Sequence, residues 1–462
     1  MGELEVKDIQ GLLRHGYPYF DAAAYCLFEI DNPAGMRGWL DRLLDPRDRW
    51  IDNAHLGAST LRSDDCGVAI AFTRGGLEQL GLDKQDLRTF VSEFQEGMAV
   101  PHRSRLLGDV DESDPDKWTW GRERDKSWLH GLLIVFAPDR QLEASLAEIH
   151  AIAGRPRLRY RVTSVRRPND HGVVVEPFGF ADGISQPFVA GLTRKPPPSG
   201  VRVVRPGEFV LGYLNEFGRF PASPALGRNS RECPLPQDAS GRADFGRNGS
   251  YLVVRQLEQK VAPFHGFVGD DELRAARLVG RWRNGAPLVR YPDTEPRCMT
   301  LRELEAGNGF GYHREDRHGL RCPIGAHIRR ANPRDSLADS LGISSERAQE
   351  LVDQHRILRR GRVYEEKGAE KIEQGLMFLC LNANIERQFE FVQSSWLMHP
   401  EFGGLVGETD PILGNAKPPR NFTVQRSVLG ERYEGLRQFV RVKGGEYFFL
   451  PGLQALRYLA NP

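Results

Sequence analysis

The sequence LLIVF at residues 132–136 is a run of apolar residues that predicts a buried strand. Residues 141–152 follow it with apolar side chains spaced three or four positions apart, which predicts a helix. Residues 158–165 (LRYRVTSV) then return to a strand-like pattern. A strand, a helix and another strand in succession indicate a sheet covered by helices.

Two similar units precede this stretch. Residues 22–30 predict a strand, after which Asn32 and Pro33 predict a helix start with Asn as N-cap and Pro at the first helical position. Residues 67–72 (GVAIAF) predict a second strand, and Thr73 caps the helix that follows it. The first third of the chain therefore alternates strands and helices.

The last third repeats this theme. Residues 376–381 predict a strand, and the apolar residues of 385–397 recur at the spacing of a helix. Residues 439–450 predict two strands around a Gly-Gly turn at 444–445, and a final helix starts at Pro451. We therefore expect an α+β class, with a duplicated architecture whose sheets are covered by helices.

Composition excludes several classes of protein. The chain has 462 residues, with 63 Lys and Arg against 62 Asp and Glu, so no global charge favours nucleic acid or an anionic membrane. The six cysteines form no CxxC pair, which argues against a disulfide scaffold or a zinc finger. With neither a signal peptide nor a membrane-spanning segment in the sequence, we expect a cytoplasmic location.

The first segment with candidate chemistry is GFADGISQP at residues 179–187. Its two glycines allow sharp turns and close approach of the backbone on either side of Asp182. A carboxylate in an apolar setting has a raised pKa and can transfer a proton near neutral pH. The alternative is an ordinary Asp-Gly turn beside a strand.

The second segment is CPIGAHIRRANPR at residues 322–334. Gly325 and Ala326 carry little bulk, so a flat ligand could approach His327. Imidazole is a good ligand for iron, and the arginines that follow suit the carboxylates of heme. The alternatives are a surface helix with a hydrogen-bonded histidine and, as a rival iron ligand, the thiolate of Cys322.

The third segment is HRILRRG at residues 355–361. Arg359 follows apolar residues and precedes a turn, so it can direct a fixed positive charge into a pocket. The alternative is a basic helix end, where arginine favours the C-terminal dipole.

Together, these segments resemble the motifs of dye-decolorizing peroxidases, a family of heme peroxidases. Residues 179–187 resemble its Gly-x-x-Asp-Gly motif, 326–334 its proximal-histidine motif, and 357–361 its distal-arginine motif. The resemblance extends from residues 8–11 (DIQG) to 444–451 (GGEYFFLP), in the family's order. The Pro-rich middle and the long spacing between the last two motifs indicate the larger subgroup called class C or V.

The resemblance implies a duplicated ferredoxin-like α+β fold, with antiparallel sheets covered by helices and one heme b in the C-terminal half. It implies an N-terminal domain over residues 1–168 and a heme-binding domain over 169–462. Residues 195–250 are rich in Pro, Gly, Arg and Asn, and 336–353 are helical in character, so we expect both to be insertions.

The resemblance also implies roles for single residues. His327 is expected to be the proximal iron ligand, with Asp410 accepting a hydrogen bond from it. Asp182 and Arg359 are expected on the distal face of the heme. Asp182 would transfer a proton between the two peroxide oxygens, and Arg359 would stabilise negative charge on the departing oxygen.

Four further residues are expected to contact the heme. Arg334 matches a contact with a propionate, and Gly183 follows the distal carboxylate. Leu376 and Phe378 match apolar walls of the distal pocket, and their spacing on a strand places both on one face.

The implied activity is reduction of hydrogen peroxide with oxidation of dyes, phenols or similar organic reductants. Large reductants would give up electrons at surface aromatic residues, for which the candidates are Trp118, Trp120, Trp128, Tyr364 and Trp396. The chain is expected to be a monomer or homodimer, without nucleic-acid or membrane partners.

Two alternatives stay open at this point. The first is a heme carrier, a heme sensor or a deferrochelatase-like protein, although none of these needs both Asp182 and Arg359. The second is a non-heme metal hydrolase that uses His313 and His318 with Glu315 and Asp316. A nucleotide-binding protein is excluded, because the chain has no GxxxxGK[ST] motif.

Overall fold

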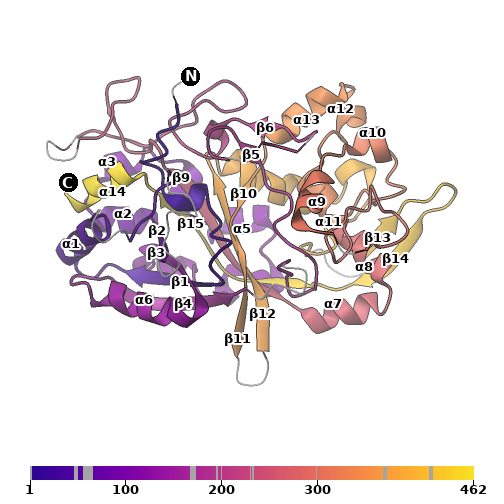
Figure 1. Cartoon of the computed structure of the whole chain (residues 1–462), viewed down its shortest axis with the longest axis horizontal. Coiled ribbons are helices and arrows are strands. Elements are labelled where there is room, and N and C mark those ends of the chain that lie inside the picture. Colours follow the sequence, from indigo (N-terminus) through magenta and orange to yellow (C-terminus); the bar gives the residue numbers. More distant parts are fainter. Residues whose placement is uncertain are drawn as a thin grey trace.

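The computed structural model describes most of the chain. The described residues are 3–45, 50–55, 66–166, 173–193, 196–198, 200–228, 230, 234–297, 299–367, 372–415 and 420–461. Figure 1 shows the earlier part of the chain on one side and the later part on the other, with the C-terminal helix beside the first helix.

The strands vary from two to eleven residues in length. They are β1 (Ala22–Glu29), β2 (Gly67–Phe72), β3 (Gly131–Ala137), β4 (Arg157–Val165), β5 (Phe188–Val189), β6 (Val203–Val204), β7 (Ala225–Leu226), β8 (Ala243–Asp244), β9 (Ser250–Gln259), β10 (Leu358–Arg359), β11 (Arg362–Lys367), β12 (Ile372–Asn382), β13 (Arg420–Val424), β14 (Glu431–Leu436) and β15 (Val440–Leu450).

The helices are mostly short. The α-helices are α1 (Pro33–Leu43), α2 (Arg74–Gln79), α3 (Lys84–Leu87), α4 (Ser92–Glu96), α5 (Pro101–Leu107), α6 (Asp139–Ala151), α7 (Val261–Val268), α8 (Glu272–Val279), α9 (Leu301–Ala306), α10 (Tyr312–Asp316), α11 (His327–Ala331), α12 (Ala338–Leu341), α13 (Ser345–Asp353) and α14 (Leu453–Ala460). The 3-10 helices are η1 (Gly11–Leu13), η2 (Asp111–Ser113), η3 (Pro115–Lys117), η4 (Glu123–Ser127), η5 (Pro206–Glu208) and η8 (Phe402–Gly404).

Nine strands of the described residues form one antiparallel sheet. Its order is β10-β12-β9-β15-β2-β3-β1-β4, and β11 also pairs with β12. The first half runs β1-α1-β2-β3-α6-β4 along the chain and has the spatial order β4-β1-β3-β2. The second half repeats this order as β15-β9-β12-β10. The repeat confirms the predicted duplicated ferredoxin-like fold of the α+β class.

The two halves share this sheet instead of forming separate sheets. Phe449 of β15 pairs with Phe72 of β2, which joins the last strand to the first half. Helix α14 then packs against α1 (Figure 1). The end of the described chain therefore belongs to the core of its first half.

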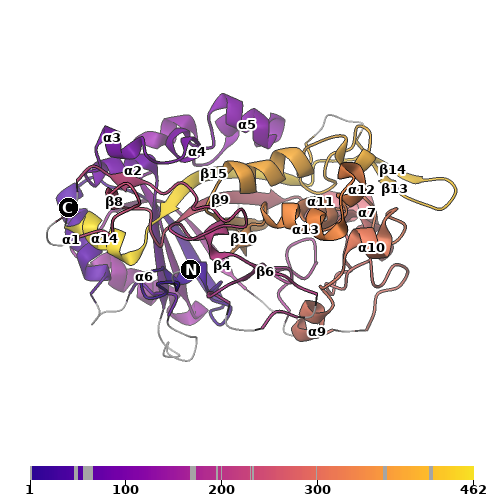
Figure 2. The ribbon, with the colours of Figure 1, turned by 90° about the horizontal axis from the view of Figure 1, so that it is seen from above.

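Strands β1, β2 and β3 are buried on both faces of the sheet, whereas the edge strand β4 is largely exposed in its first half. One face packs against helices through residues such as Trp39 of α1 and Leu142 of α6. The opposite face is covered by the N-terminal segment and by loops, with Leu12 and Phe209 among the buried residues. Seen from above, α4 and α5 lie on one side of the strands and α9 on the other (Figure 2). Burial on both faces explains why β1, β2 and β3 are continuous apolar runs without alternation.

The predicted helix starts are confirmed in the first half. The Asn32 side chain accepts a hydrogen bond from Gly35 N at 3.0 Å, and Pro33 is the first residue of α1. Thr73 Oγ1 accepts from Gly76 N at 3.2 Å before α2. Capping side chains therefore satisfy backbone donors at both helix starts.

The predicted hairpin at residues 439–450 is wrong. One strand, β15, runs through the Gly-Gly pair, with a bulge between Val442 and Gly444. A Cβ atom at Gly444 would lie 2.5 Å from Trp120 Nε1, so this glycine allows close packing of the indole instead of a turn. The final helix starts at Leu453 with Gly452 as N-cap, two residues later than predicted.

The predicted helix at residues 385–397 is present but wound more widely than an α-helix. It consists of two π-helical segments, η6 (Glu386–Glu390) and η7 (Val392–Leu397). Met398 N donates to Gln393 O at 3.0 Å, the five-residue spacing of a π-helix.

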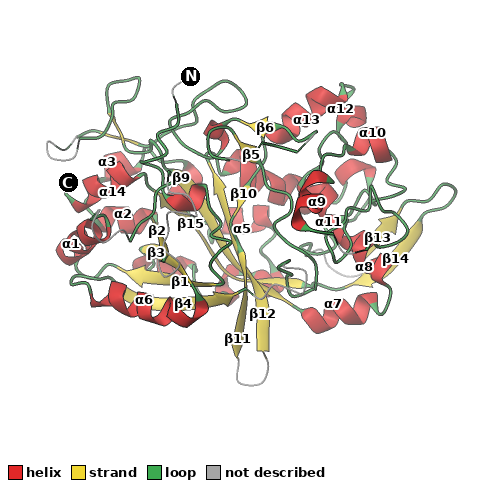
Figure 3. Cartoon of the chain, viewed as in Figure 1, coloured by secondary structure: helices red, strands yellow, loops and turns green. Residues whose placement is uncertain are grey.

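The chain between β4 and β9 consists largely of loops (Figure 3). Its described residues contain the two-residue strands β5, β6, β7 and β8 and the 3-10 helix η5. Across the described residues, every helix is too short or too polar to cross a bilayer.

Candidate active site

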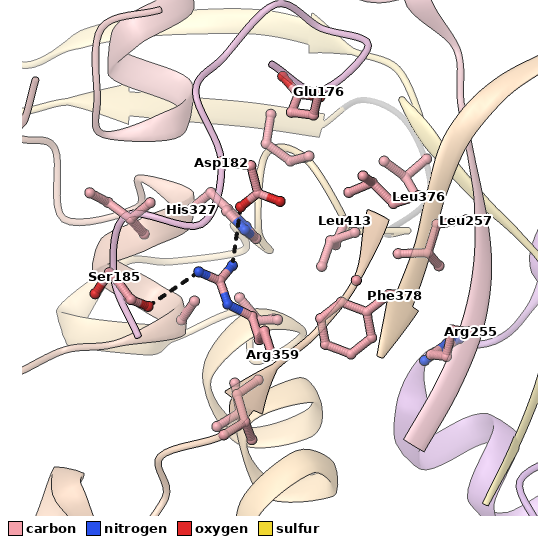
Figure 4. A pocket seen from close by; sticks show the side chains of 18 of the residues that line it. Glu176, Asp182, Ser185, Arg255, Leu257, His327, Arg359, Leu376, Phe378 and Leu413 are labelled. Carbon is pink, nitrogen blue, oxygen red and sulfur yellow. Dashed lines mark hydrogen bonds and ion pairs between the residues drawn. The ribbon is translucent and has the colours of Figure 1, made fainter. Parts of the chain in front are cut away.

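A cavity of about 470 Å³ lies between the second half of the sheet and the helices α11 and η7. Strands β9, β11, β12 and β15 supply one wall. The cavity brings together residues from all three motif segments and from β12, namely Asp182, Gly183, His327, Arg334, Arg359, Leu376 and Phe378. Figure 4 shows several of these side chains directed into one space.

His327 is the first residue of α11, and its ring is held by a buried carboxylate. Its Nδ1 lies 2.9 Å from Asp410 Oδ2, while Asp410 Oδ1 accepts hydrogen bonds from Ile412 N at 2.9 Å and Leu413 N at 2.7 Å. Burial alone would raise the pKa of Asp410, but His327 and the bond from Leu413 lower it. An ionised Asp410 favours the proton on Nδ1, which leaves Nε2 as the nitrogen available to a metal.

The predicted space beside His327 is filled by other residues. A Cβ atom at Gly325 would lie 3.2 Å from the Phe422 ring and 3.3 Å from Leu405, and Ala326 is fully buried. Neither Gly325 nor Ala326 lines the cavity. The expectation that these two residues clear room for a flat ligand is therefore wrong, because Gly325 lies against Leu405 and against Phe422 of β13, and Ala326 belongs to a buried cluster with Phe310 and Cys322.

Asp182 and Arg359 lie side by side at the cavity. Arg359 Nη1 is 3.9 Å from Asp182 Oδ1, and Arg359 Nη2 donates to Ser185 O at 3.3 Å (Figure 4). Gly183 has φ +80°, and its N–H donates to Asp182 Oδ1 at 2.6 Å. Asp182 is 40% exposed and lies beside a guanidinium, so the expected apolar enclosure of this carboxylate is wrong.

Leu376 and Phe378 lie on one face of β12 and line the cavity, as their spacing predicts. In the neighbouring strand β9, Leu257 pairs with Leu376 and Arg255 with Phe378. The wall that these strands form is therefore apolar near Leu376 and Leu257, and it becomes polar at Arg255.

Two guanidinium groups meet at Asn308 on another side of the cavity. Arg334 Nη2 donates to Asn308 Oδ1 at 2.8 Å, and Arg281 Nη2 donates to the same oxygen at 2.7 Å. Burial lowers the pKa of both guanidinium groups to about 10. Within the described part of the chain, neither group forms an ion pair with a carboxylate. Two such charges beside a cavity favour binding of an anion.

Sequence reasoning missed Arg281 and Glu176, which both line the cavity. Arg281 follows α8 and lies outside the three motif segments. Glu176 lies three residues before Gly179, and its carboxylate accepts hydrogen bonds from Phe178 N and Phe180 N. Neither residue stands in a pattern that differs from ordinary polar surface, so only the tertiary structure reveals them.

The rival ligands in the sequence are engaged elsewhere. Burial raises the pKa of the Cys322 thiol to about 12, and Cys322 does not line the cavity. Asp316 pairs with Arg329 at 3.0 Å, and His313 lies 3.4 Å from Asp339. The described residues contain no cluster of three or more His, Cys, Asp or Glu side chains suited to a metal ion.

The chain resembles known proteins over most of its length. It is 30% identical to a dye-decolorizing peroxidase of Mycetinis scorodonius, over 84% of this chain and 75% of that protein. The chain belongs to the dye-decolorizing peroxidase family. It is also 29% identical to the family member AauDyP1 of Auricularia auricula-judae, over 98% of this chain and 86% of that protein.

Solved structures of the family share the fold. A structure described as an ancestral D-type dye-decolorizing peroxidase superposes with a TM-score of 0.77 and 28% identity, covering 99% of both chains. No family model matches the sequence.

Proposed function

We propose that this chain is a heme-dependent peroxidase that reduces hydrogen peroxide and oxidises dyes, phenols or similar organic reductants. The observation that carries the proposal is the placement of Asp182 and Arg359 beside one another in the cavity that His327 also lines. The dye-decolorizing activity named for its relatives supports it.

We infer that the cavity would hold one heme b, because its lining offers an imidazole, positive charge and apolar side chains. His327 would hold the iron through Nε2, while Asp410 holds the imidazole ring through Nδ1. Arg334 and Arg281 supply positive charge for the two propionates, which would give these buried guanidinium groups their missing carboxylates. Leu376 and Phe378 provide apolar contact for the porphyrin.

The heme, when bound, supplies the redox-active iron at which peroxide is reduced. Asp182 accepts the proton of the peroxide oxygen nearer the cofactor and delivers it to the outer oxygen, which leaves as water. Arg359 stabilises negative charge on the outer oxygen while the O–O bond breaks. Its hydrogen bond to Ser185 O keeps the guanidinium beside Asp182.

The second candidate is a heme carrier, a sensor or a deferrochelatase-like protein. Such a protein needs His327 and the arginines around the propionates, but it needs no proton-transfer pair on the other side of the cofactor. The ion pair of Asp182 with Arg359 therefore favours the peroxidase.

The test replaces these two residues in heme-loaded protein. Asp182→Asn and Arg359→Leu are expected to lower the rate constant for reaction with peroxide by about 100- to 10,000-fold, while the Soret band shows full heme content. Arg347→Leu is the matched control, because Arg347 lies in α13 and pairs on the surface with Glu350.

Two outcomes would contradict the proposal. Loss of the Soret band after removal of free heme from the native chain would exclude a heme protein. Unchanged peroxide turnover in both variants, with heme retained, would favour the carrier. Dye and 2,6-dimethoxyphenol oxidation by peroxide report the activity towards organic reductants.

Other aspects of the function stay predictions. These are the class C or V subgroup, the domain boundary between residues 168 and 169, the cytoplasmic location, the monomer or homodimer, and the aromatic residue that passes electrons to large substrates. Trp118, Trp120, Tyr364 and Trp396 are buried, so direct contact of these four with a large reductant is disfavoured.

A further inference from the structure

We propose that Glu176 is a positioning residue that holds the loop carrying Asp182 at the distance from Arg359 that proton transfer needs. The inference rests on the proposed peroxidase function. It concerns residues 174–182, which form a small two-armed loop between the end of β4 and the long loops of the middle of the chain.

Glu176 closes the tip of this loop through both its backbone and its side chain. Glu176 N donates to Phe180 O at 2.9 Å, and Gly179 N donates to Glu176 O at 2.7 Å. Its Oε1 accepts from Phe180 N at 2.8 Å, and its Oε2 accepts from Phe178 N at 3.0 Å. One residue therefore satisfies the backbone of the whole turn.

The arm that follows this turn carries Asp182. Val175 and Ala181 form an antiparallel bridge, and Asp182 N donates to Val174 O at 3.2 Å. The turn at Glu176 and the carboxylate of Asp182 thus belong to one hydrogen-bonded unit. A change in the turn is expected to move Asp182, because only Ala181 separates it from Phe180.

Glu176 also ties this unit to the sheet. Gln259, the last residue of β9, donates a hydrogen bond from Nε2 to Glu176 Oε2. Strand β9 pairs with β12, and β12 pairs with β10, where Arg359 lies opposite Cys380. Strands of one sheet therefore hold both residues: Arg359 lies in β10, and Asp182 is linked to β9 through Glu176. Figure 4 shows Glu176 and Asp182 on the same stretch of loop.

The loop has other supports, so loss of the carboxylate should loosen it without unfolding it. The Phe178 ring stacks on Phe264 of α7 with centroids 4.4 Å apart, and Ala181 N donates to Arg283 O at 2.8 Å. Arg283 also donates to Phe178 O. These contacts hold the loop independently of the Glu176 carboxylate.

The chemistry at residue 176 requires a carboxylate. Both oxygens accept, and the three donors are Phe178 N, Phe180 N and Gln259 Nε2. An amide has a single acceptor oxygen, so in Glu176→Gln one of the two backbone N–H groups loses its partner whichever way the amide is turned. Burial raises the pKa of Glu176, and the charge of Asp182 adds to this.

The experiment compares Glu176→Gln with Glu446→Gln in heme-loaded protein. Glu446 is the matched control, because it is a buried glutamate outside the cavity that also accepts from two backbone N–H groups, Met98 N at 3.3 Å and Tyr447 N at 2.7 Å. Both bonds use Oε1, so glutamine retains them. Gln259→Leu is a second variant that keeps Glu176 and removes its link to β9.

We expect Glu176→Gln to lower the rate constant for peroxide about 10- to 100-fold, the effect of a displacement near 1 Å at a reacting group. The rate constant for cyanide binding, which also needs a distal base for its proton, should fall in parallel. Heme content from the Soret band and KM for the organic reductant should not change. Gln259→Leu should show a smaller loss of the same kind, and Glu446→Gln should stay within about twofold of the native chain.

Each outcome decides between the two proposals. If Asp182→Asn is inactive while Glu176→Gln and Gln259→Leu react with peroxide and cyanide at native rates, the positioning role is wrong and the peroxidase stands. If Asp182→Asn keeps native rates, the proposed function itself fails. If Glu176→Gln does not fold, native rates in Gln259→Leu overturn the positioning role.

Discussion

Asp410 is the residue whose burial has the most direct consequence for cofactor binding. Its carboxylate is fully buried, and it accepts from His327 and from two backbone N–H groups. An outer carboxylate of this kind orients a metal-bound imidazole and increases its basicity. His327 therefore depends on Asp410 for its orientation.

Asp410→Asn is expected to keep the fold but weaken heme retention. The asparagine amide at position 410 still has one oxygen that can accept a hydrogen bond, but it carries no negative charge to polarise the imidazole of His327. We expect heme to leave about 10- to 100-fold faster, as measured by its transfer to an excess of apomyoglobin. Asp339→Asn, at an exposed ion pair with Arg317, should leave the rate unchanged. A native rate in Asp410→Asn would show that the hydrogen bond does not support the iron ligand.

Arg281→Met is expected to have opposite effects on the apoprotein and on the holoprotein. Its guanidinium is buried without a carboxylate in the described part of the chain, so its removal should leave the free energy of unfolding of the apoprotein equal or higher. Heme affinity should fall about 10- to 100-fold, because one charge-assisted contact is lost. Urea unfolding of the apoprotein and heme titration measure the two effects. A less stable apoprotein with native heme affinity would assign Arg281 a purely structural role.

Strand β15 shows how a close packing contact can resemble a turn in the sequence. Gly444→Ala should lower the free energy of unfolding by about 1–3 kcal/mol, because the added Cβ would overlap the Trp120 ring. Gly38→Ala in α1 is the matched control, since no atom lies within 4 Å of the added Cβ and the site is exposed. It should raise stability by about 0.5–1 kcal/mol. If both substitutions changed the free energy of unfolding in denaturant equally, close packing of Gly444 against Trp120 would not explain the glycine in β15.

Elements were predictable from the sequence where one local signal dominates. Strands β1, β2 and β3 are buried runs, and Asn32 and Thr73 cap the helices that follow two of them. The short strand β10 and the polar strand β11 have no such signal, and both pair with β12 in the folded chain. The Gly-Gly pair of β15 was misread because its partner, Trp120, is more than 300 positions away in the chain.

Prediction of the candidate site from the sequence is limited in the same way, because it succeeds only where a local signal exists. Asp182, His327 and Arg359 stand in segments that resemble family motifs, so the sequence was sufficient to place them in one site. Glu176 is bonded to Gln259, 83 positions away, and Arg281 to Asn308, 27 positions away, and only the folded chain brings these partners together. Residues whose partners are distant in sequence therefore need the structure.

For the whole molecule, several buried carboxylates with raised pKa values make the stability depend on pH. Burial raises the pKa of Glu446 to about 7, and it also raises the pKa of Asp109, Glu208 and Glu390. A folded-state pKa above the unfolded value favours the protonated form in the fold. Stability from such groups is therefore fully present below the unfolded pKa and is lost as pH rises through the folded pKa.

We accordingly expect the stability that these four carboxylates contribute to fall between about pH 5 and pH 8, with roughly 3 kcal/mol of this loss due to Glu446. Glu446→Gln should reduce the loss by that amount, because glutamine does not titrate. The free energy of unfolding of both proteins in urea at several pH values measures it. The same slope in both proteins would show that Glu446 does not titrate in this range.

The position of β15 and α14 has a consequence for synthesis on the ribosome. Strand β2 is complete early, yet its neighbour β15 and the helix that covers α1 are translated almost 400 residues later. Until then the nascent chain exposes an unpaired apolar strand edge, which is an aggregation risk. We therefore expect truncated or stalled chains to depend on chaperones far more than the finished protein.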